Sequence, residues 1–148
     1  MKFLHWASVL ALALIIAAPA SAQQYGTSAE AKAMLEKVVA DMKANKAKTL
    51  QDISAGAFKE KDLYPFCGGP DGNFTAHGAN PGLVGQSMKD RKDPTGNAYG
   101  AEFYKVAQEG KFSQVSYMIP KPGDTTPVAK ESYITKIGDE VCGVGYNK

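Results

Sequence analysis

Apolar residues recur at helical spacing in the N-terminal third of the chain. Five of them follow one face of a helix: Ala31, Met34, Leu35, Val38 and Met42. The preceding residues 27–30, Thr-Ser-Ala-Glu, have the pattern of a capping box. We therefore predict an amphipathic helix over residues 28 to about 46. A shorter helical turn is predicted to start at Thr49, with Asp52 three residues later, and to end at Gly56.

Beyond Phe58 the pattern changes to short apolar or aromatic runs between Gly, Pro and Asp, which is typical of strands and tight turns. Five strands are predicted, over residues 63–67, 74–77, 115–119, 131–137 and 140–146. A second helix is predicted over residues 98–108, with Gly110 as its stop. Pro65 cannot donate a ladder hydrogen bond, so the first strand either begins after it or has a bulge there. The order is helix, two strands, helix, three strands.

An apolar run lies near the N-terminus. Lys2 precedes the run at residues 7–18, and small residues follow it before Gln23. The run is shorter than the about 20 apolar residues that span a bilayer, and a proline ends it. We therefore expect a secretory signal peptide at residues 1–22, one domain at residues 23–148, a periplasmic or secreted product, and no membrane insertion after cleavage.

Charge limits the possible partners. The chain has 17 Lys and Arg against 15 Asp and Glu, and loss of a signal peptide with Lys2 and no acidic residue would lower the net charge from +2 to +1. Such a chain lacks a basic run that could track a phosphate backbone, so nucleic acid is not an expected partner. The 44% hydrophobic residues favour one folded domain over disorder.

Two cysteines, Cys67 and Cys142, are 75 positions apart. In an oxidising compartment a single disulfide is the default interpretation. The alternative is a Cys67 nucleophile with His77 as its base, which requires that Cys142 stays free.

The order of short motifs resembles a known family. The segments YPFCGGPDGNFTAHGANPGLVGQ, KDRKDPTGN, VSYMIPKPG, AKESYITKIGDE and GVGY together resemble the single Cache domains, type 2, of bacterial extracellular sensing. The resemblance runs from the N-terminal helix to Tyr146. It implies an α+β fold with a PAS-like five-stranded antiparallel sheet, the long N-terminal helix on one face and a small-ligand pocket on the other. It also implies that the strands of Cys67 and Cys142 are central neighbours, close enough for a disulfide.

Two positions depart from the family pattern. Met118 and Val141 stand where members usually carry tryptophan, so we expect a less aromatic pocket wall. Most members are domains of chemoreceptors or kinases, held between two membrane helices. The chain ends two residues after Tyr146, and we expect no transmitter module of its own.

Tyr117 and Lys130 are the main candidates for ligand contact. Tyr117 shares a strand face with Val115 and Ile119, whereas Tyr133 has the opposite parity to Lys130 and is expected to pack under the helix. A lysine in a half-buried strand requires an anionic partner, because burial of an unpaired ammonium is costly; the alternative is a surface lysine. The resemblance aligns both residues with family motifs, Lys130 with the lysine before the fourth-strand Ser-Tyr.

His77 lies in the glycine-rich stretch 69–85. A zinc site needs three or four ligands, and one histidine with scattered carboxylates falls short, so no metal is expected. Acid or base catalysis would need a nucleophile or an orienting group, and no motif supplies one. We favour a position at the pocket rim, with a histidine that is only hydrogen-bonded at a strand end as the alternative.

The sequence therefore predicts a soluble periplasmic sensory module without a cofactor. Tyr117, Lys130 and His77 are expected to line a pocket for a small organic anion, a carboxylate. The alternative is a protein-interaction subunit of a membrane-bound sensor kinase or chemoreceptor, without its own ligand. An enzyme is not expected, because no arrangement supplies nucleophile, base and orienting group together.

Overall fold

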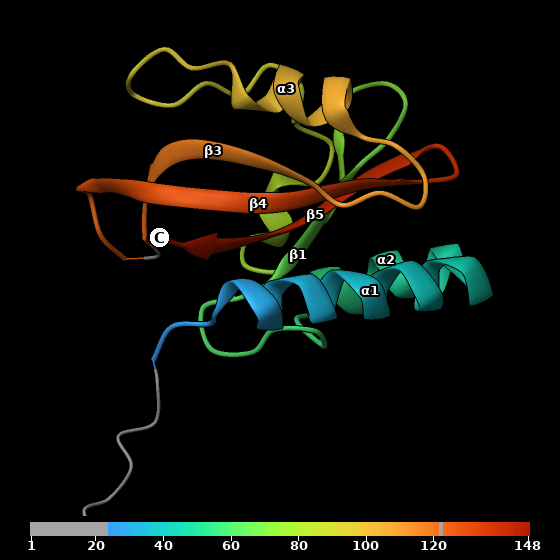
Figure 1. The fold of residues 1–148 in the computed structure, drawn as a ribbon. Coiled ribbons are helices and arrows are strands. Elements are labelled where there is room, and N and C mark those ends of the chain that lie inside the picture. The colour runs from blue at the N-terminus through green and yellow to red at the C-terminus, as the bar shows by residue number, and fades with distance from the viewer. Residues whose placement is uncertain (1–23, 122) are drawn as a thin grey trace, which may run out of the picture.

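The computed structural model describes residues 24–121 and 123–148. Its elements are α1 (Ser28–Ala44), α2 (Lys46–Ser54), β1 (Pro65–Gly68), β2 (Phe74–His77), the 3₁₀ turn η1 (Pro81–Leu83), α3 (Tyr99–Val106), β3 (Ser113–Pro120), β4 (Pro127–Ile137) and β5 (Glu140–Asn147). The strands form one antiparallel sheet in the order β2-β1-β5-β4-β3. Helices α1 and α2 cover one face and α3 lies over the other (Figure 1). The predicted α+β fold is confirmed, whereas the signal peptide lies outside the described residues and stays a prediction.

Helix α1 starts at the predicted capping box, in which the Thr27 hydroxyl accepts from the Glu30 amide and the Glu30 carboxylate accepts from the Thr27 amide. It ends at Ala44, because Asn45 is extended and caps the next helix through Lys48. The predicted helix start at Thr49 is wrong. Thr49 lies inside α2 and its hydroxyl donates to the Asn45 carbonyl.

Several strand boundaries differ from the prediction by one or two residues, and the start of β4 differs by four. Strand β1 begins at Pro65 itself, where a proline as first residue removes no ladder hydrogen bond. Strand β4 begins at Pro127, four residues earlier than predicted, and pairs with β3 along its length. This extension brings Lys130 into the sheet, directly opposite Tyr117 on β3 and Asn147 on β5.

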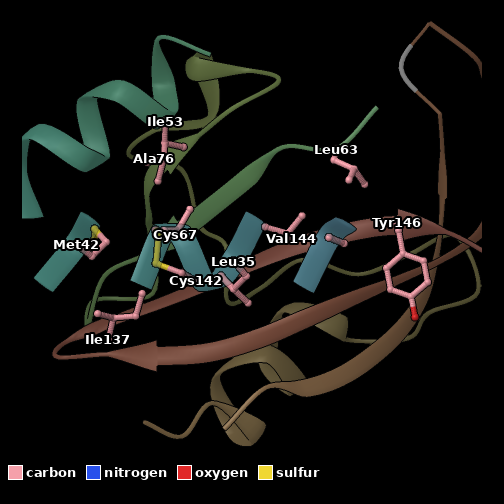
Figure 2. Packing of buried hydrophobic residues seen from close by; sticks show 12 residues of the cluster. Leu35, Met42, Ile53, Leu63, Cys67, Ala76, Ile137, Cys142, Val144 and Tyr146 are labelled. Carbon is pink, nitrogen blue, oxygen red and sulfur yellow. A yellow bond between two sulfur atoms is a disulfide. The ribbon is translucent and has the colours of Figure 1, made fainter. Parts of the chain in front are cut away.

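The face beneath α1 and α2 carries the helix-side core (Figure 2), whose main members are Leu35, Val38, Met42, Ile53, Leu63, Cys67, Ala76, Ile137, Cys142, Val144 and Tyr146. Cys67 and Cys142 oppose each other in the β1–β5 register and form a disulfide. Both are fully buried. Tyr133 packs against this core and its hydroxyl is 2.8 Å from Ser28 Oγ of α1, as its strand parity predicts.

The opposite face carries the α3-side core, made of Phe66, Phe74, Met88, Phe103, Val115, Tyr117, Ile134 and Val141. Alternation along each strand divides the side chains between the two cores, since successive residues point to opposite faces. No helix in the part of the chain that the structure describes is long and apolar enough to cross a membrane.

Replacement of both cysteines by alanine should destabilise the domain strongly. The disulfide closes a loop of about 75 residues, and by the chain-entropy model its removal lowers the free energy of unfolding by about 4 kcal/mol. Urea unfolding of the wild type and of Cys67→Ala/Cys142→Ala measures this difference. A reductant should shift the wild-type midpoint and leave that of the double variant unchanged. Equal midpoints for the two oxidised proteins would contradict the prediction.

Candidate ligand-binding site

The central strand carries two glycines on the α3 side of the sheet, and neighbouring side chains pack over them. On this face β5 presents Gly143 and Gly145 beside Ile134 and Ser132 of β4. A Cβ atom at Gly145 would lie only 2.5 Å from Lys130 Cε and 2.7 Å from Ser132 Oγ. A side chain at this position would displace Lys130, because the stem of Lys130 crosses the strand there.

A small cavity of about 50 Å³ lies on this face, lined by Tyr64, Phe66, Phe74, His77, Tyr99, Phe103, Tyr117 and Ile119. Its wall is mostly aromatic. Neither Met118 nor Val141 is among the lining residues. The two departures from the family pattern therefore do not make the cavity wall less aromatic, contrary to our expectation. The side chain of Met118 has the opposite parity to Tyr117 on β3.

Tyr117 lies at the base of the cavity. Its ring stacks on Tyr99 of α3 with centroids 4.5 Å apart, and its hydroxyl is 2.7 Å from Ser132 Oγ. Burial, the largest cause, raises the pKa of Tyr117 above its ordinary value. The phenol therefore stays protonated at neutral pH and keeps a proton to donate.

Lys130 is buried, with only 5% of its surface exposed. The surface-lysine alternative is therefore wrong for this structure. Its Nζ donates to Tyr64 Oη at 3.3 Å and lies 4.7 Å from the centre of the Tyr64 ring. Among the described residues, no carboxylate lies within ion-pair distance of this ammonium. The hydrogen-bond partner of this buried lysine is a neutral hydroxyl.

His77 is held in one orientation by the backbone that follows β2. Its Nδ1 accepts from the amides of Ala79 and Asn80 at 3.3 and 3.0 Å, so the neutral ring carries its proton on Nε2. Burial, followed by the positive charges of Lys130 and Arg91, lowers the pKa of His77 to about 4. The ring is neutral at pH 7 and is a donor at Nε2.

Two of the three predicted contact residues, His77 and Tyr117, line this cavity. Lys130 is not among its lining residues, but its ammonium donates to the hydroxyl of Tyr64, which is one of them. The alternative of a Cys67 nucleophile with His77 as base is excluded in this structure, because the Cys67 sulfur is bonded to Cys142 within the helix-side core.

Six lining residues were missed by the sequence analysis: Tyr64, Phe66, Phe74, Tyr99, Phe103 and Ile119. Tyr99 and Phe103 are four positions apart on α3, a spacing that places them on one helix face. Tyr64 and Phe66 share strand parity. These periodicities were present in the sequence, but which face they share with His77 and Tyr117 depends on the sheet order.

Asp93 fastens the loop before α3 to the edge strand β3. One carboxylate oxygen accepts from the amide and hydroxyl of Thr95 and from the amide of Asn97, and the other from the Met118 amide at 2.9 Å. The Thr95 hydroxyl is the main cause that keeps the pKa of Asp93 below its ordinary value. This anchor positions Tyr99 over Tyr117. Within residues 24–121 and 123–148, no group of three or more His, Cys, Asp or Glu side chains could hold a metal ion.

Residues 25–140 match the family model dCache_2, described as a Cache domain. This chain belongs to the Cache domain family. A curated relative of the Cache domain is the methyl-accepting chemotaxis protein McpP of Pseudomonas putida, which is 43% identical over 58 residues. That match covers 39% of this chain and 11% of the receptor.

Solved structures share the fold of this Cache domain. A methyl-accepting chemotaxis protein from Vibrio parahaemolyticus superposes with a TM-score of 0.67 at 26% identity, over 80% of this chain and 86% of that one. A periplasmic sensor domain of a chemotaxis protein gives 0.61 at 25% identity, over 78% and 86%. A Cache chemosensory domain solved to explain carboxylic acid recognition gives 0.60 at 24% identity, over 78% and 84%, and shows the common fold.

The stability of the Cache domain should fall in mild acid because of His77. Its folded-state pKa of about 4 lies below the ordinary value of about 6.5, so only the unfolded chain gains a proton between these two pH values. The contribution is fully present above pH 6.5 and is lost toward pH 4, with a loss of about 2 kcal/mol at pH 5.

The matched variant is His77→Asn, whose side-chain oxygen can replace Nδ1 as the acceptor and does not titrate. Urea unfolding of both proteins at pH 7.5 and pH 5 isolates the histidine, since carboxylates with lowered pKa values affect both alike. We expect the wild type to lose about 2 kcal/mol more than the variant. Equal losses would show that the folded state does not suppress protonation of His77.

Proposed function

We propose that this Cache domain is a sensory module that binds a small monocarboxylate on the periplasmic or outer side of the cell. The observation that carries the proposal is Lys130, an ammonium that is 5% exposed and has no carboxylate partner among the described residues. Burial of an unpaired charge costs several kcal/mol. An anion from solution would relieve that cost.

The groups around the cavity suit a carboxylate head. Lys130 supplies a positive charge, His77 a donor at Nε2, and Tyr117 a phenolic proton. Burial is the main cause that lowers the pKa of His77, and the charges of Lys130 and Arg91 add to it; the positive potential of these two residues also favours an anion. A bound carboxylate would take the place of the neutral Tyr64 hydroxyl as the partner of the ammonium.

The cavity also limits the size of the ligand. A water molecule needs about 10 to 15 Å³ of such space, so about 50 Å³ accommodates about four heavy atoms. This corresponds to acetate, or to propionate with slight adjustment of the aromatic wall. With a ceiling of about −1.5 kcal/mol per heavy atom, a four-atom ligand cannot bind more tightly than tens of micromolar.

The relatives support a sensory role without catalysis. The similar proteins are chemotaxis receptors or their periplasmic sensor domains, and we propose by analogy that this domain serves a signalling system. The neighbour known for carboxylic acid recognition shares the fold; for this chain the proposed ligand class rests on the charges of its own cavity.

Calorimetric titration with acetate, propionate and butyrate tests the proposal directly. We expect binding of at least one acid with a dissociation constant between tens of micromolar and about a millimolar. Propionamide, which has the shape of propionate without its charge, should not bind detectably. The proposal fails if no acid gives heat or a thermal shift at millimolar concentration, or if the amide binds as well as the acid.

Substitution of Lys130 by methionine should weaken acid binding without destabilising the empty domain. The variant keeps an apolar stem and loses the charge and its donors. Hydrogen bonds to charged groups contribute about 1.5 to 3 kcal/mol, so the affinity should fall by about 10-fold to 150-fold. The melting temperature of the empty domain should stay the same or rise, because a desolvated ammonium is removed.

Lys136→Met is the matched control, because Lys136 lies on the same strand face as Lys130 but is exposed. It should leave acid affinity unchanged. Equal affinities of wild type and Lys130→Met for an acid that the wild type binds would remove Lys130 from the site.

A further inference from the structure

Two hollows meet at one side chain. Beside the inner cavity lies a surface cleft of about 230 Å³, whose lining includes Tyr25, Lys59, Lys61, Lys121, Asn147 and Tyr64. Tyr64 is the one residue in the described part of the chain that lines both hollows. Its ring therefore forms the wall between a small aromatic cavity and a larger basic cleft.

We infer that Tyr64 is a specificity-determining residue, which restricts the site to monocarboxylates by separating the inner cavity from a basic cleft that would accept a second carboxylate. The inference rests on the proposed function and concerns the class of acid that is selected. Its basis is the position of Tyr64 between a cavity with an aromatic lining, beside Lys130, and a cleft whose lining includes Lys59, Lys61 and Lys121.

Contacts on both sides fix the position of the Tyr64 ring. Lys130 Nζ donates to Tyr64 Oη at 3.3 Å, and the Tyr64 ring lies 5.1 Å from the ring of His77. On the cleft side the neighbouring Asp62 accepts from the Gly26 amide and from Asn147 Nδ2, each at 2.6 Å. These contacts fasten the segment before β1 to the start of α1 and to the end of β5, so Tyr64 has a defined place.

Lys130 lies where an acid could reach either hollow. On β4 it is directly opposite Tyr117, which lines the inner cavity, and directly opposite Asn147, which lines the cleft. A carboxylate bound at its ammonium therefore lies next to the Tyr64 ring. With the ring in place, it separates an acid in the inner cavity from the lysines of the cleft.

The charges of the cleft indicate what would occupy it once the wall is removed. Lys59 and Lys121 have no carboxylate within ion-pair distance among the described residues, although Lys121 lies over the ring of Tyr25. Asp62, the acidic residue of the cleft lining, already accepts two hydrogen bonds. The cleft thus favours a second anionic group over an apolar tail.

The test compares propionate with the dicarboxylates succinate and glutarate, by calorimetry on wild type and Tyr64→Ala. We expect the wild type to prefer propionate. In Tyr64→Ala, the affinity for at least one dicarboxylate relative to propionate should rise by about 10-fold, since the second carboxylate gains contacts with the exposed lysines. The gain should shrink as salt is raised.

Three further variants isolate the wall. Tyr64→Phe keeps the ring and should keep the wild-type preference for propionate. Tyr25→Ala removes an aromatic residue that lines only the cleft, so it should keep this preference too. Addition of Lys59→Met to Tyr64→Ala should reverse part of the rise in dicarboxylate affinity, because it removes one of the cleft lysines. Tyr64→Leu, a milder truncation, replaces Tyr64→Ala if the latter melts below the assay temperature.

The possible results separate this inference from the proposed function. Wild type that binds propionate, with an unchanged preference in Tyr64→Ala and Tyr64→Leu, overturns the role of Tyr64 and leaves the monocarboxylate site intact. Wild type that binds succinate as tightly as propionate also overturns it. If no variant binds any acid, the proposed function fails and this inference fails with it. If only the Tyr64 truncations bind an acid, the result supports the role of Tyr64 as a barrier between the two hollows and contradicts the function proposed for the wild type.

Discussion

The pairing of β5 with both β1 and β4 is the interaction on which the rest of the structure depends. Strand β5 is the middle of the five strands, and alternation divides its residues between the two faces. One face presents Cys142, Val144 and Tyr146 to the helix-side core, where the disulfide joins β5 to β1. The other presents Gly143 and Gly145, whose missing side chains make room for the ring of Phe66 and for the stem of Lys130. The strand that stabilises the fold therefore also positions side chains in and beside the cavity.

Electrostatics in the cavity follow from this arrangement. Because Gly145 has no side chain, the stem of Lys130 can cross the central strand. Its ammonium then lies next to the ring and hydroxyl of Tyr64. Burial, followed by the charges of Lys130 and Arg91, lowers the pKa of His77 and keeps the ring neutral. The neutral donors His77 and Tyr117 line the small cavity, and Lys130 lies beside it through its hydrogen bond to Tyr64. The proposed binding of a small anion rests on this arrangement.

Much of the architecture was predictable because it depends on local patterns. The capping box at Thr27 and the apolar spacing after it identified α1, and strand parity placed Tyr117 and Tyr133 on opposite sides of the sheet, as observed. The errors were local as well. Asn45 caps α2 better than Thr49 does, and pairing with β3 extended β4 back to Pro127. Residues 127–130 lack a strand signal of their own, so only their partner strand orders them.

By itself the sequence determined the two faces of the helix and of each strand, because a periodicity of 3.6 or 2 is a property of neighbouring residues along the chain. It also determined that Cys67 and Cys142 lie on the same face of adjacent strands once the family order of strands is assumed. Which aromatic residues form the cavity was decided only by the tertiary structure. Tyr64, Tyr99 and Tyr117 are far apart in sequence and meet because the sheet order and the Asp93 anchor bring three segments together. The burial of Lys130 has the same origin, since the exposure of a side chain depends on what packs over it from other parts of the chain.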